Sequence, residues 1–310
     1  MFDFSGQIKN YSSVDQNPAE FDDVQSQAVS CLLTNSSIEL STNGEAAIRG
    51  ASEILPPGMP VYVPKMPRET LADKLVQIKL LRKYGLNPIP HIVARQLASE
   101  RELSDFLGVA SRQGGVHRVL VIGGDDPKAV GPYQDSASVL ASGALQGNGI
   151  DMVDVAGYPD GHPQISSEIL LADLKSKSAL AKSHGFGLNV VTQFSFEPSN
   201  IVAYCADLAL TVPEVPVYAG LVGPTSPAKL LRFAKICGVG TSMRAANKLG
   251  VNALKLAMHA SPDKQFEILA RHKETEETGN LMGIHLFSFG GFVDSSKWLD
   301  GKARDSGVRS

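Results

Sequence analysis

The chain has 310 residues, a formal net charge of -3 at pH 7 and a pI of about 6.2. Hydrophobic residues make up 43% and charged residues 20%, a balance typical of globular proteins with a sizeable core. The slight excess of acidic residues argues against a nucleic-acid-binding surface as the main function. No apolar run approaches the ~18 residues of a membrane span, and the polar N-terminus lacks the apolar core of a secretory signal. We therefore expect a cytoplasmic protein that binds neither nucleic acid nor a membrane.

Short apolar runs alternate with longer stretches of helical periodicity along most of the chain. The first 36 residues read as a loose leader followed by a helix over about residues 18–33. The expected strands cover residues 37–40, 61–63, 88–93, 118–122, 152–156, 189–192, 215–221 and 283–287. The expected helices cover residues 68–84, 100–113, 133–145, 166–184, 198–210, 227–237, 241–249 and 252–273.

Strands that alternate with helices in this way indicate an α/β fold with a parallel sheet. With eight repeats in one chain, a closed (β/α)8 TIM barrel is favoured over an open doubly wound sheet. No linker rich in Gly, Ser or Pro divides the chain. We predict a single barrel domain over residues 37–310, preceded by a helical extension over residues 1–36. Outer barrel helices often pair, but no pattern in the sequence selects a face, so the question of a homo-oligomer is left open.

The three cysteines, Cys31, Cys205 and Cys237, are too widely spaced to indicate a zinc site or a disulfide framework. A metal site built from His91 and His162 would lack a third ligand at a suggestive spacing. We therefore expect reduced thiols and no bound metal.

Polar residues follow several of the expected strands at the point where each strand ends. In TIM barrels the carboxyl ends of the strands form the rim that holds the active site. Those ends are marked here by Glu39, His91, Asp125, His162 and Gln193. Their convergence on one rim predicts a functional site there.

Glu39 is unusual because it lies inside the apolar run Ser-Ile-Glu-Leu at 37–40. Burying a carboxylate costs several kcal/mol unless it is paired, so its presence there needs a reason. Glu39 is either a general acid that keeps its proton in a dry site, or a structural carboxylate bonded to a neighbouring Arg or Lys. The sequence alone leaves these evenly balanced.

The other rim residues also have two interpretations. Gly123 and Gly124 either let a flat ligand approach the backbone or form an ordinary turn capped by Asp125. His162, in the stiff run Tyr-Pro-Asp-Gly-His-Pro at 158–163, either binds a ligand or is structural. The amide of Gln193 either reads the edge of a heterocycle or bonds to the barrel rim. No Rossmann glycine fingerprint or P-loop is present to bind a nucleotide.

Taken in chain order, these strings resemble the catalytic barrel of methylenetetrahydrofolate reductases, from about residue 37 to residue 289. The matching strings are Ser-Ile-Glu at 37–39, Pro-His at 90–91, Gly-Gly-Asp at 123–125, Tyr-Pro-Asp-Gly-His-Pro at 158–163 and Thr-Gln-Phe-Ser-Phe-Glu at 192–197. Each string is weak alone, but five in the right order at strand ends are specific.

The resemblance implies a bound FAD lying across the rim. It implies that the flavin is contacted by His91, Gly123, Gly124, Asp125, Ser136, Tyr158 and His162. Asp173 and Lys182 are the best matches to the residues near the FAD diphosphate. Glu39 matches the general acid, and Asp125 and Gln193 match residues that bond the pterin ring. The implied reaction interconverts 5,10-methylenetetrahydrofolate and 5-methyltetrahydrofolate, a step of one-carbon metabolism and methionine biosynthesis, by hydride transfer through the flavin.

Three departures weaken the match at the electron donor and at the folate tail. Gly123 replaces the Arg that precedes Gly-Asp in the family, and Pro227 replaces a Phe that stacks on nicotinamide. The last strand ends in Phe-Ser-Phe-Gly-Gly at 287–291 rather than near Thr-Leu-Asn-Arg. NADH or NADPH as donor, another donor, and the oxidative direction all stay open. A flavin- or folate-binding barrel without reductase activity, acting as a partner subunit or in methyl transfer, is the alternative.

Overall fold

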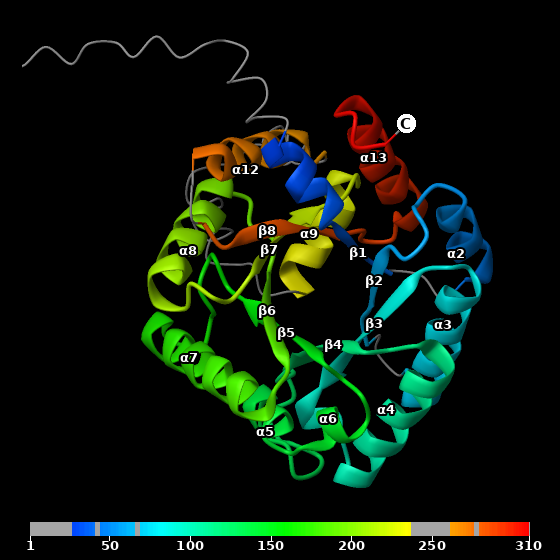
Figure 1. Cartoon of the computed structure of the whole chain (residues 1–310), viewed down its shortest axis with the longest axis vertical. Helices are drawn as coiled ribbons and strands as arrows, with labels where there is room; N and C mark the ends of the chain where they lie inside the picture. The colour runs from blue at the N-terminus through cyan, green and yellow to red at the C-terminus, as the bar shows by residue number, and fades with distance from the viewer. Residues whose placement is uncertain (1–26, 41–43, 66–68, 237–260, 276–278, 310) are drawn as a thin grey trace, which may run out of the picture.

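Eight parallel strands form a closed barrel in chain order, β1 to β8 (Figure 1). The computed structural model describes residues 27–40, 44–65, 69–236, 261–275 and 279–309. The strands are β1 Ser37–Glu39, β2 Pro60–Val63, β3 Asn87–Val93, β4 Arg118–Ile122, β5 Met152–Gly157, β6 Gly187–Thr192, β7 Val217–Val222 and β8 Leu281–Phe287. Pairing of β8 with β1, which sets Ser37 opposite His285, closes the barrel. The predicted TIM barrel and its eight strands are confirmed.

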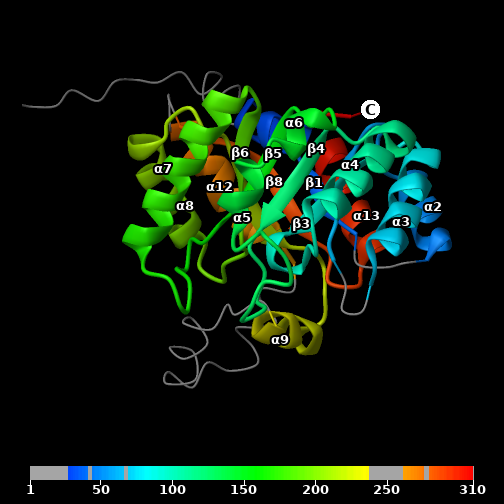
Figure 2. The same ribbon diagram turned by 90° about the horizontal axis from the view of Figure 1, so that it is seen from below.

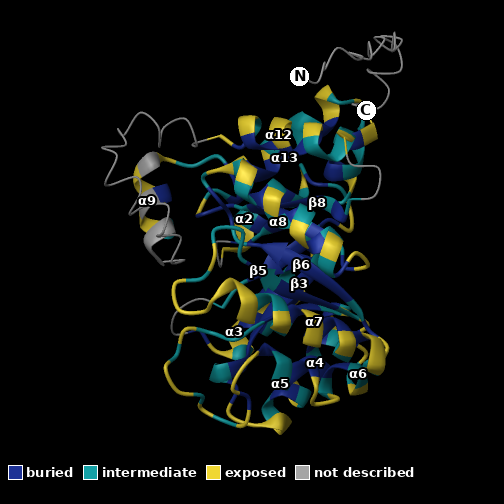
Figure 3. Cartoon of the chain, turned by 90° about the vertical axis from the view of Figure 1, so that its left-hand side faces the viewer, coloured by how far each residue is buried: buried dark blue, intermediate teal, exposed yellow. Residues whose placement is uncertain are grey.

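Helices surround the barrel and cover the outer faces of the strands (Figures 1 and 3). They are α2 Glu45–Ser52, α3 Leu71–Lys83, the short η1 Ala94–Gln96, α4 Glu100–Gly114, α5 Ser136–Leu140, α6 Ala144–Gly147, α7 Ser167–His184, α8 Pro198–Thr211, α9 Pro227–Ile236, α12 Asp263–Thr275 and α13 Phe292–Asp305. Helix α9 lies apart from the ring, on the side toward which the loops after β4 and β5 extend (Figure 2).

The observed helices differ from the predicted ones where local chemistry intervenes. The helix expected over 133–145 is two short helices, because Gly143 adopts a left-handed φ of 76° between them. Helix α3 begins at Leu71 rather than near residue 68, because Thr70 and Asp73 form a capping box there. The short α2 and the C-terminal α13 were not predicted. The helix expected over 241–249 and the start of the one over 252–273 lie outside the described residues.

Apolar side chains form three clusters that define the layers of the barrel. The largest fills the space between strands and helices. A second lies within the barrel and contains Tyr62, Ile89, Leu120 and Val191. A third, which we call the aromatic rim, lies where β6, β7 and β8 end and consists of Phe194, Phe196, Val222, Leu230, Phe233, Phe287 and Phe289.

Residues 27–34 are helical and contact the opposite end of the barrel. The Cys31 thiol lies 3.6 Å from the carbonyl oxygen of Met282 at the start of β8, and a side chain at Gly283 would clash with the Asn35 carbonyl. Most of the predicted N-terminal extension precedes the described residues, so the division at residue 36 stays a prediction. No helix in the described ranges is both long and apolar enough to cross a membrane.

Candidate active site

The Glu39 carboxylate lies between two histidines at the carboxyl end of β1. Its Oε2 is 3.7 Å from His91 Nε2 and 4.0 Å from His285 Nε2, and the side chain is only 14% exposed. Its backbone carbonyl accepts a 2.6 Å hydrogen bond from Ser288, which fixes the end of β1 to the end of β8. Among the described residues, no Arg or Lys lies within ion-pair distance of Glu39. The Arg or Lys partner expected for a purely structural carboxylate is therefore not among them.

Burial keeps the neighbouring His91 neutral. Burial lowers the pKa of His91 well below its ordinary value, and the charges of Lys74 and His285 add to the effect. Lys74 donates a 2.6 Å hydrogen bond to the His91 backbone carbonyl, and His91 Nε2 has no hydrogen-bond partner among the described residues. On the side of His91, Glu39 therefore faces a neutral imidazole rather than a fixed cation.

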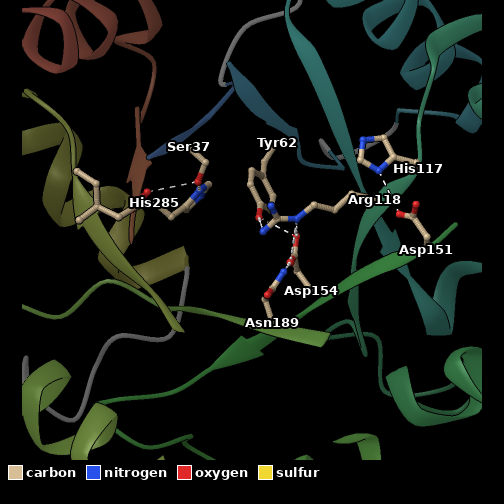
Figure 4. Close-up of polar contacts among 9 residues, drawn as sticks. Ser37, Tyr62, His117, Arg118, Asp151, Asp154, Asn189 and His285 are labelled. Carbon is tan, nitrogen blue, oxygen red and sulfur yellow. Dashed lines mark hydrogen bonds and ion pairs between the residues drawn. The ribbon is translucent and has the colours of Figure 1, made fainter. Parts of the chain in front are cut away.

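Ser37 contacts the ring nitrogen of His285 that does not face Glu39. The Ser37 hydroxyl lies 2.9 Å from His285 Nδ1, and His285 is almost completely buried (Figure 4). Because Nδ1 is engaged by Ser37, the other ring nitrogen faces Glu39. His285 was not predicted as a site residue, although a histidine within the apolar run of β8 carries the same signal that marked Glu39.

A buried polar network lies inside the barrel next to His285 (Figure 4). The Tyr62 ring is 4.5 Å from the His285 ring and 6.0 Å from the His91 ring, centroid to centroid. The Tyr62 hydroxyl donates a 2.7 Å hydrogen bond to Asp154, which is also bound by Arg118 and Asn189. These four residues were also missed, because each belongs to a strand that otherwise reads as apolar.

A second polar group forms where β4 and β5 end. The rings of Tyr158 and His162 meet edge to face with centroids 5.1 Å apart. Burial raises the pKa of Tyr158, and the nearby carboxylates of Asp125 and Asp173 raise it further. Partial burial lowers the pKa of His162, although Asp125 opposes the shift. The structure thus gathers four of the predicted site residues in one place.

The loop that holds Tyr158 and His162 is tied to the next loop of the barrel. Asp160 accepts hydrogen bonds from Ser195 at 2.6 Å and from Asn200 at 2.8 Å. The backbone N–H of Gln164 donates to His162 Nδ1 at 3.2 Å, so a neutral His162 carries its proton on Nε2. The loop after β5 therefore has a fixed shape relative to the loop after β6, where Gln193 lies.

A model of the family described as methylenetetrahydrofolate reductase matches residues 66–251. The chain belongs to the methylenetetrahydrofolate reductase family. A solved protein from Clostridium thermocellum, described as binding two copies of 5-methyl-5,6,7,8-tetrahydrofolic acid, superposes with a TM-score of 0.59 at 12% identity. The match covers 88% of this chain and 95% of that one. At this identity the likeness shows the shared barrel fold and no more.

A weaker match is the dihydropteroate synthase of Thermus thermophilus. It has a TM-score of 0.47 and 12% identity, with 87% of this chain and 92% of that one covered.

Methylenetetrahydrofolate reductases generally use a flavin, and two glycines at the end of β4 leave the backbone there without side chains. A Cβ added to Gly123 would meet no atom within 4 Å. Gly124 has a φ of +94°, and a Cβ there would lie 2.6 Å from a Val93 methyl group. Buried polar atoms without partners among the described residues occur on the same rim, on His91, Gln96, Tyr133 and Thr225. These features fit a large planar ligand with several polar edges.

The loop after β4 is held by the segment that follows β3. Arg95 donates hydrogen bonds to the carbonyl oxygens of Gln134, at 2.8 Å, and Asp126, at 3.0 Å. A side chain at Gly131 would overlap the backbone after η1, so the two segments pack directly together. Ser136 is buried at the first turn of α5, where this loop ends. The family's Gly-Asp loop is thus rigid here although Gly123 replaces its Arg.

Two other predicted residues lie on opposite ends of α7. Asp173 lies in its second turn, near Tyr158, and forms an ion pair with Lys177. Lys182 lies in the last turn and forms a 2.7 Å ion pair with Glu214, which precedes β7. The end of α7 and the segment before β7 belong to the opposite end of the barrel. The structure therefore does not bring Lys182 to the rim.

Aromatic side chains line the ends of β7 and β8, where the sequence departs from the family motifs. Phe233 of α9 stacks on Phe289 with centroids 4.4 Å apart and planes 14° from parallel. Phe287 meets the His285 ring edge to face at 4.7 Å. Gln193 borders this region, and its Oε1 accepts a 3.1 Å hydrogen bond from the Phe194 N–H. Within the described ranges, no group of three His, Cys, Asp or Glu side chains could hold a metal ion.

Proposed function

We propose that this chain is a flavin-dependent oxidoreductase that interconverts 5,10-methylenetetrahydrofolate and 5-methyltetrahydrofolate. The proposal rests on Glu39, a mostly buried carboxyl group that faces two histidines and has no Arg or Lys within ion-pair distance among the described residues. Family membership supports the reaction class. The 5-methyltetrahydrofolate bound by the Clostridium thermocellum protein supports a folate as the substrate.

Glu39 is proposed as the general acid. Opening the five-membered ring of the methylene substrate needs a proton on the nitrogen that leaves, and this produces an iminium cation on the substrate. Glu39 would hold that proton at Oε2, and the neutral His91 lies beside it, with its Nε2 3.7 Å away. In the oxidative direction the Glu39 carboxylate takes the proton back. FAD, when bound, supplies the group that gives or accepts the hydride.

Asp125 and Gln193 are proposed to bind the pterin ring. Asp125 is exposed at the rim and, when ionised, stabilises the iminium cation electrostatically. Gln193 already uses its amide oxygen on the Phe194 N–H. Its amide nitrogen is therefore the atom we assign to the pterin.

The flavin is proposed to lie along the ends of β3, β4 and β5. We assign its contacts to His91, Gly123, Gly124, Asp125, Ser136, Tyr158 and His162. Asp173 lies next to this group and is assigned to the side of the diphosphate, with Lys177 as the nearby cation. Lys182 is left out because it pairs with Glu214 at the other end of α7. The electron donor and the physiological direction are separate questions, since Pro227 and the aromatic rim replace the family's motifs there.

Replacement of Glu39 tests the acid assignment. We expect Glu39→Gln to bind FAD but to lose about 10²- to 10⁴-fold in the rate at which 5-methyltetrahydrofolate reduces the flavin, because the amide cannot exchange the proton. Stopped-flow absorbance under anaerobic conditions measures that rate. Glu53→Gln, an exposed carboxyl on the barrel surface, is the control and should react like the parent. A Glu39→Gln variant with the full folate rate would remove Glu39 from the mechanism.

A further inference from the structure

The interior of this barrel contains a complete ion pair, in a layer that TIM barrels usually fill with branched apolar side chains. Arg118 Nε donates to both carboxylate oxygens of Asp154, at 3.0 and 2.8 Å. Asn189 donates to Oδ1 at 2.9 Å and Tyr62 donates to Oδ2 at 2.7 Å. Asp154 is fully buried and the Arg118 side chain is 15% exposed. One carboxylate thus joins side chains from β2, β4, β5 and β6.

Stability alone is a weak explanation for such a network. A buried ion pair loses the hydration of both charges, and apolar residues of similar volume often stabilise a core equally well or better. What the network adds is a fixed direction for the tyrosine. The Tyr62 hydroxyl donates to Asp154 and also accepts a 3.1 Å hydrogen bond from Arg118 Nη2. With the hydroxyl held on both sides, the ring is fixed in position.

The fixed ring contacts both histidines that flank Glu39. Its plane is 68° from that of His285 and 79° from that of His91, so both imidazoles meet it close to edge-on. Ser37 holds the far side of His285, and the ring therefore limits the remaining freedom of that imidazole. This arrangement leaves the two Nε2 atoms at 3.7 and 4.0 Å from Glu39.

These separations are just outside hydrogen-bond range, so a shift below 1 Å decides whether either histidine bonds to Glu39. We propose that Tyr62 is a positioning residue: anchored by Arg118 and Asp154, its ring sets the distances of His91 and His285 from Glu39 and thereby decides whether either imidazole can hydrogen-bond to that carboxyl group. The inference rests on the proposed role of Glu39. It implies that the interior network affects the step in which the folate exchanges hydride with the flavin.

Two substitutions of Tyr62 and one matched control test this inference. Tyr62→Phe keeps the ring and removes its anchor, whereas Tyr62→Leu removes the ring. Tyr218→Phe is the control: the Tyr218 ring lies over the same Arg118 guanidinium, 5.1 Å away, and the described contacts show no ring packing between it and either histidine. All three are prepared as flavin-loaded full chains, and circular dichroism establishes that each is folded.

The kinetic readout is the pH profile of flavin reduction by 5-methyltetrahydrofolate. Misplacing a reacting group by about 1 Å can cost on the order of 100-fold. We expect Tyr62→Phe to slow this step roughly tenfold and to move the midpoint of its pH profile, and Tyr62→Leu to slow it further. Reduction of the flavin by dithionite, which involves no folate, should not change. Tyr218→Phe should keep the parent profile.

Nitrogen-15 NMR of the histidine rings gives a readout that does not depend on turnover. Tyr62→Phe should shift the His91 and His285 ring signals, and Tyr218→Phe should leave them in place. A folded Tyr62→Phe protein with the parent pH profile and parent histidine signals would overturn the inference. If histidine signals move while Glu39→Gln keeps its full rate, the positioning holds and the proposed function fails instead.

Discussion

Glu39 and Asp154 are both carboxylates in buried strands, and they differ entirely in their partners. Asp154 accepts hydrogen bonds from three side chains, one of them an arginine. Among the described residues, the Glu39 carboxyl group is paired with two imidazoles, at 3.7 and 4.0 Å. A carboxylate saturated with donors has no reason to take up a proton, whereas one beside a neutral histidine can exchange it. These partners support the proposed proton-transfer role of Glu39 and an anchoring role for Asp154.

The buried Lys74 should make the free energy of unfolding depend on pH. Burial is the main cause that lowers its pKa from 10.5 to about 7. Below pH ~7 both the folded and the unfolded chain hold the proton, and the folded state has the full cost of a buried cation. Between about pH 7 and pH 10.5 the unfolded chain binds a proton that the folded chain has lost, so the free energy of unfolding rises with pH across this window.

Lys74→Met should remove that rise because the group no longer titrates. Urea unfolding at several pH values below and within the window measures the effect. Lys79→Met, an exposed lysine on the same helix, is the control and should keep the parent slope. Parallel pH profiles for the parent and Lys74→Met would contradict the prediction.

At the scale of elements, the loop after β4 begins with two adjacent glycines, Gly123 and Gly124, whose surroundings differ. Gly124→Ala places a side chain at a φ of +94° and within 2.6 Å of Val93, so we expect it to destabilise the fold by about 1–3 kcal/mol. Gly123→Ala meets no atom within 4 Å and should leave stability unchanged. Because we propose that the flavin occupies the space at Gly123, we expect Gly123→Ala to weaken FAD binding while the stability of the apoprotein stays the same. Denaturant unfolding and FAD titration of the apoprotein separate the two effects.

Much of the element structure could be predicted because buried parallel strands read as continuous apolar runs. Helix α4 was also placed well, since Ser99 caps its start and Gly115 ends it at a left-handed φ of 62°. Helices α2 and α13 were missed because serines and internal glycines, such as Gly50 and Gly301, weaken their helical pattern. The family motifs pointed to residues at the ends of the strands, but they did not reveal that Lys182 belongs to the far end of α7.

At the scale of the whole molecule, what the sequence could not reveal is which inward-facing residues meet across the barrel. Tyr62, Arg118 and Asp154 are far apart in the chain and meet only because eight strands close with one particular stagger. Each residue alone looks like an ordinary exception in an apolar strand. The contacts among these three residues can therefore be recognised only in the closed barrel.

Because Asp154 joins four strands, its loss should affect the whole barrel. Asp154→Ala leaves the Arg118 charge buried without its partner, and we expect it to lower the free energy of unfolding by about 3–5 kcal/mol. The double change Arg118→Met with Asp154→Leu removes both charges and should recover most of that loss. Urea unfolding of the two variants measures the difference. Equal destabilisation by the single and the double change would show that the charge is not the cause.

The proposed function requires a bound flavin that exchanges hydride with a folate in this barrel. Its most direct test is the visible spectrum of the purified protein, recorded anaerobically while 5-methyltetrahydrofolate, NADH and NADPH are added in turn. We predict a flavin spectrum that bleaches on addition of 5-methyltetrahydrofolate, and the response to each nicotinamide then identifies the donor. A colourless protein that takes up no FAD, or a bound flavin that 5-methyltetrahydrofolate does not reduce, would contradict the account.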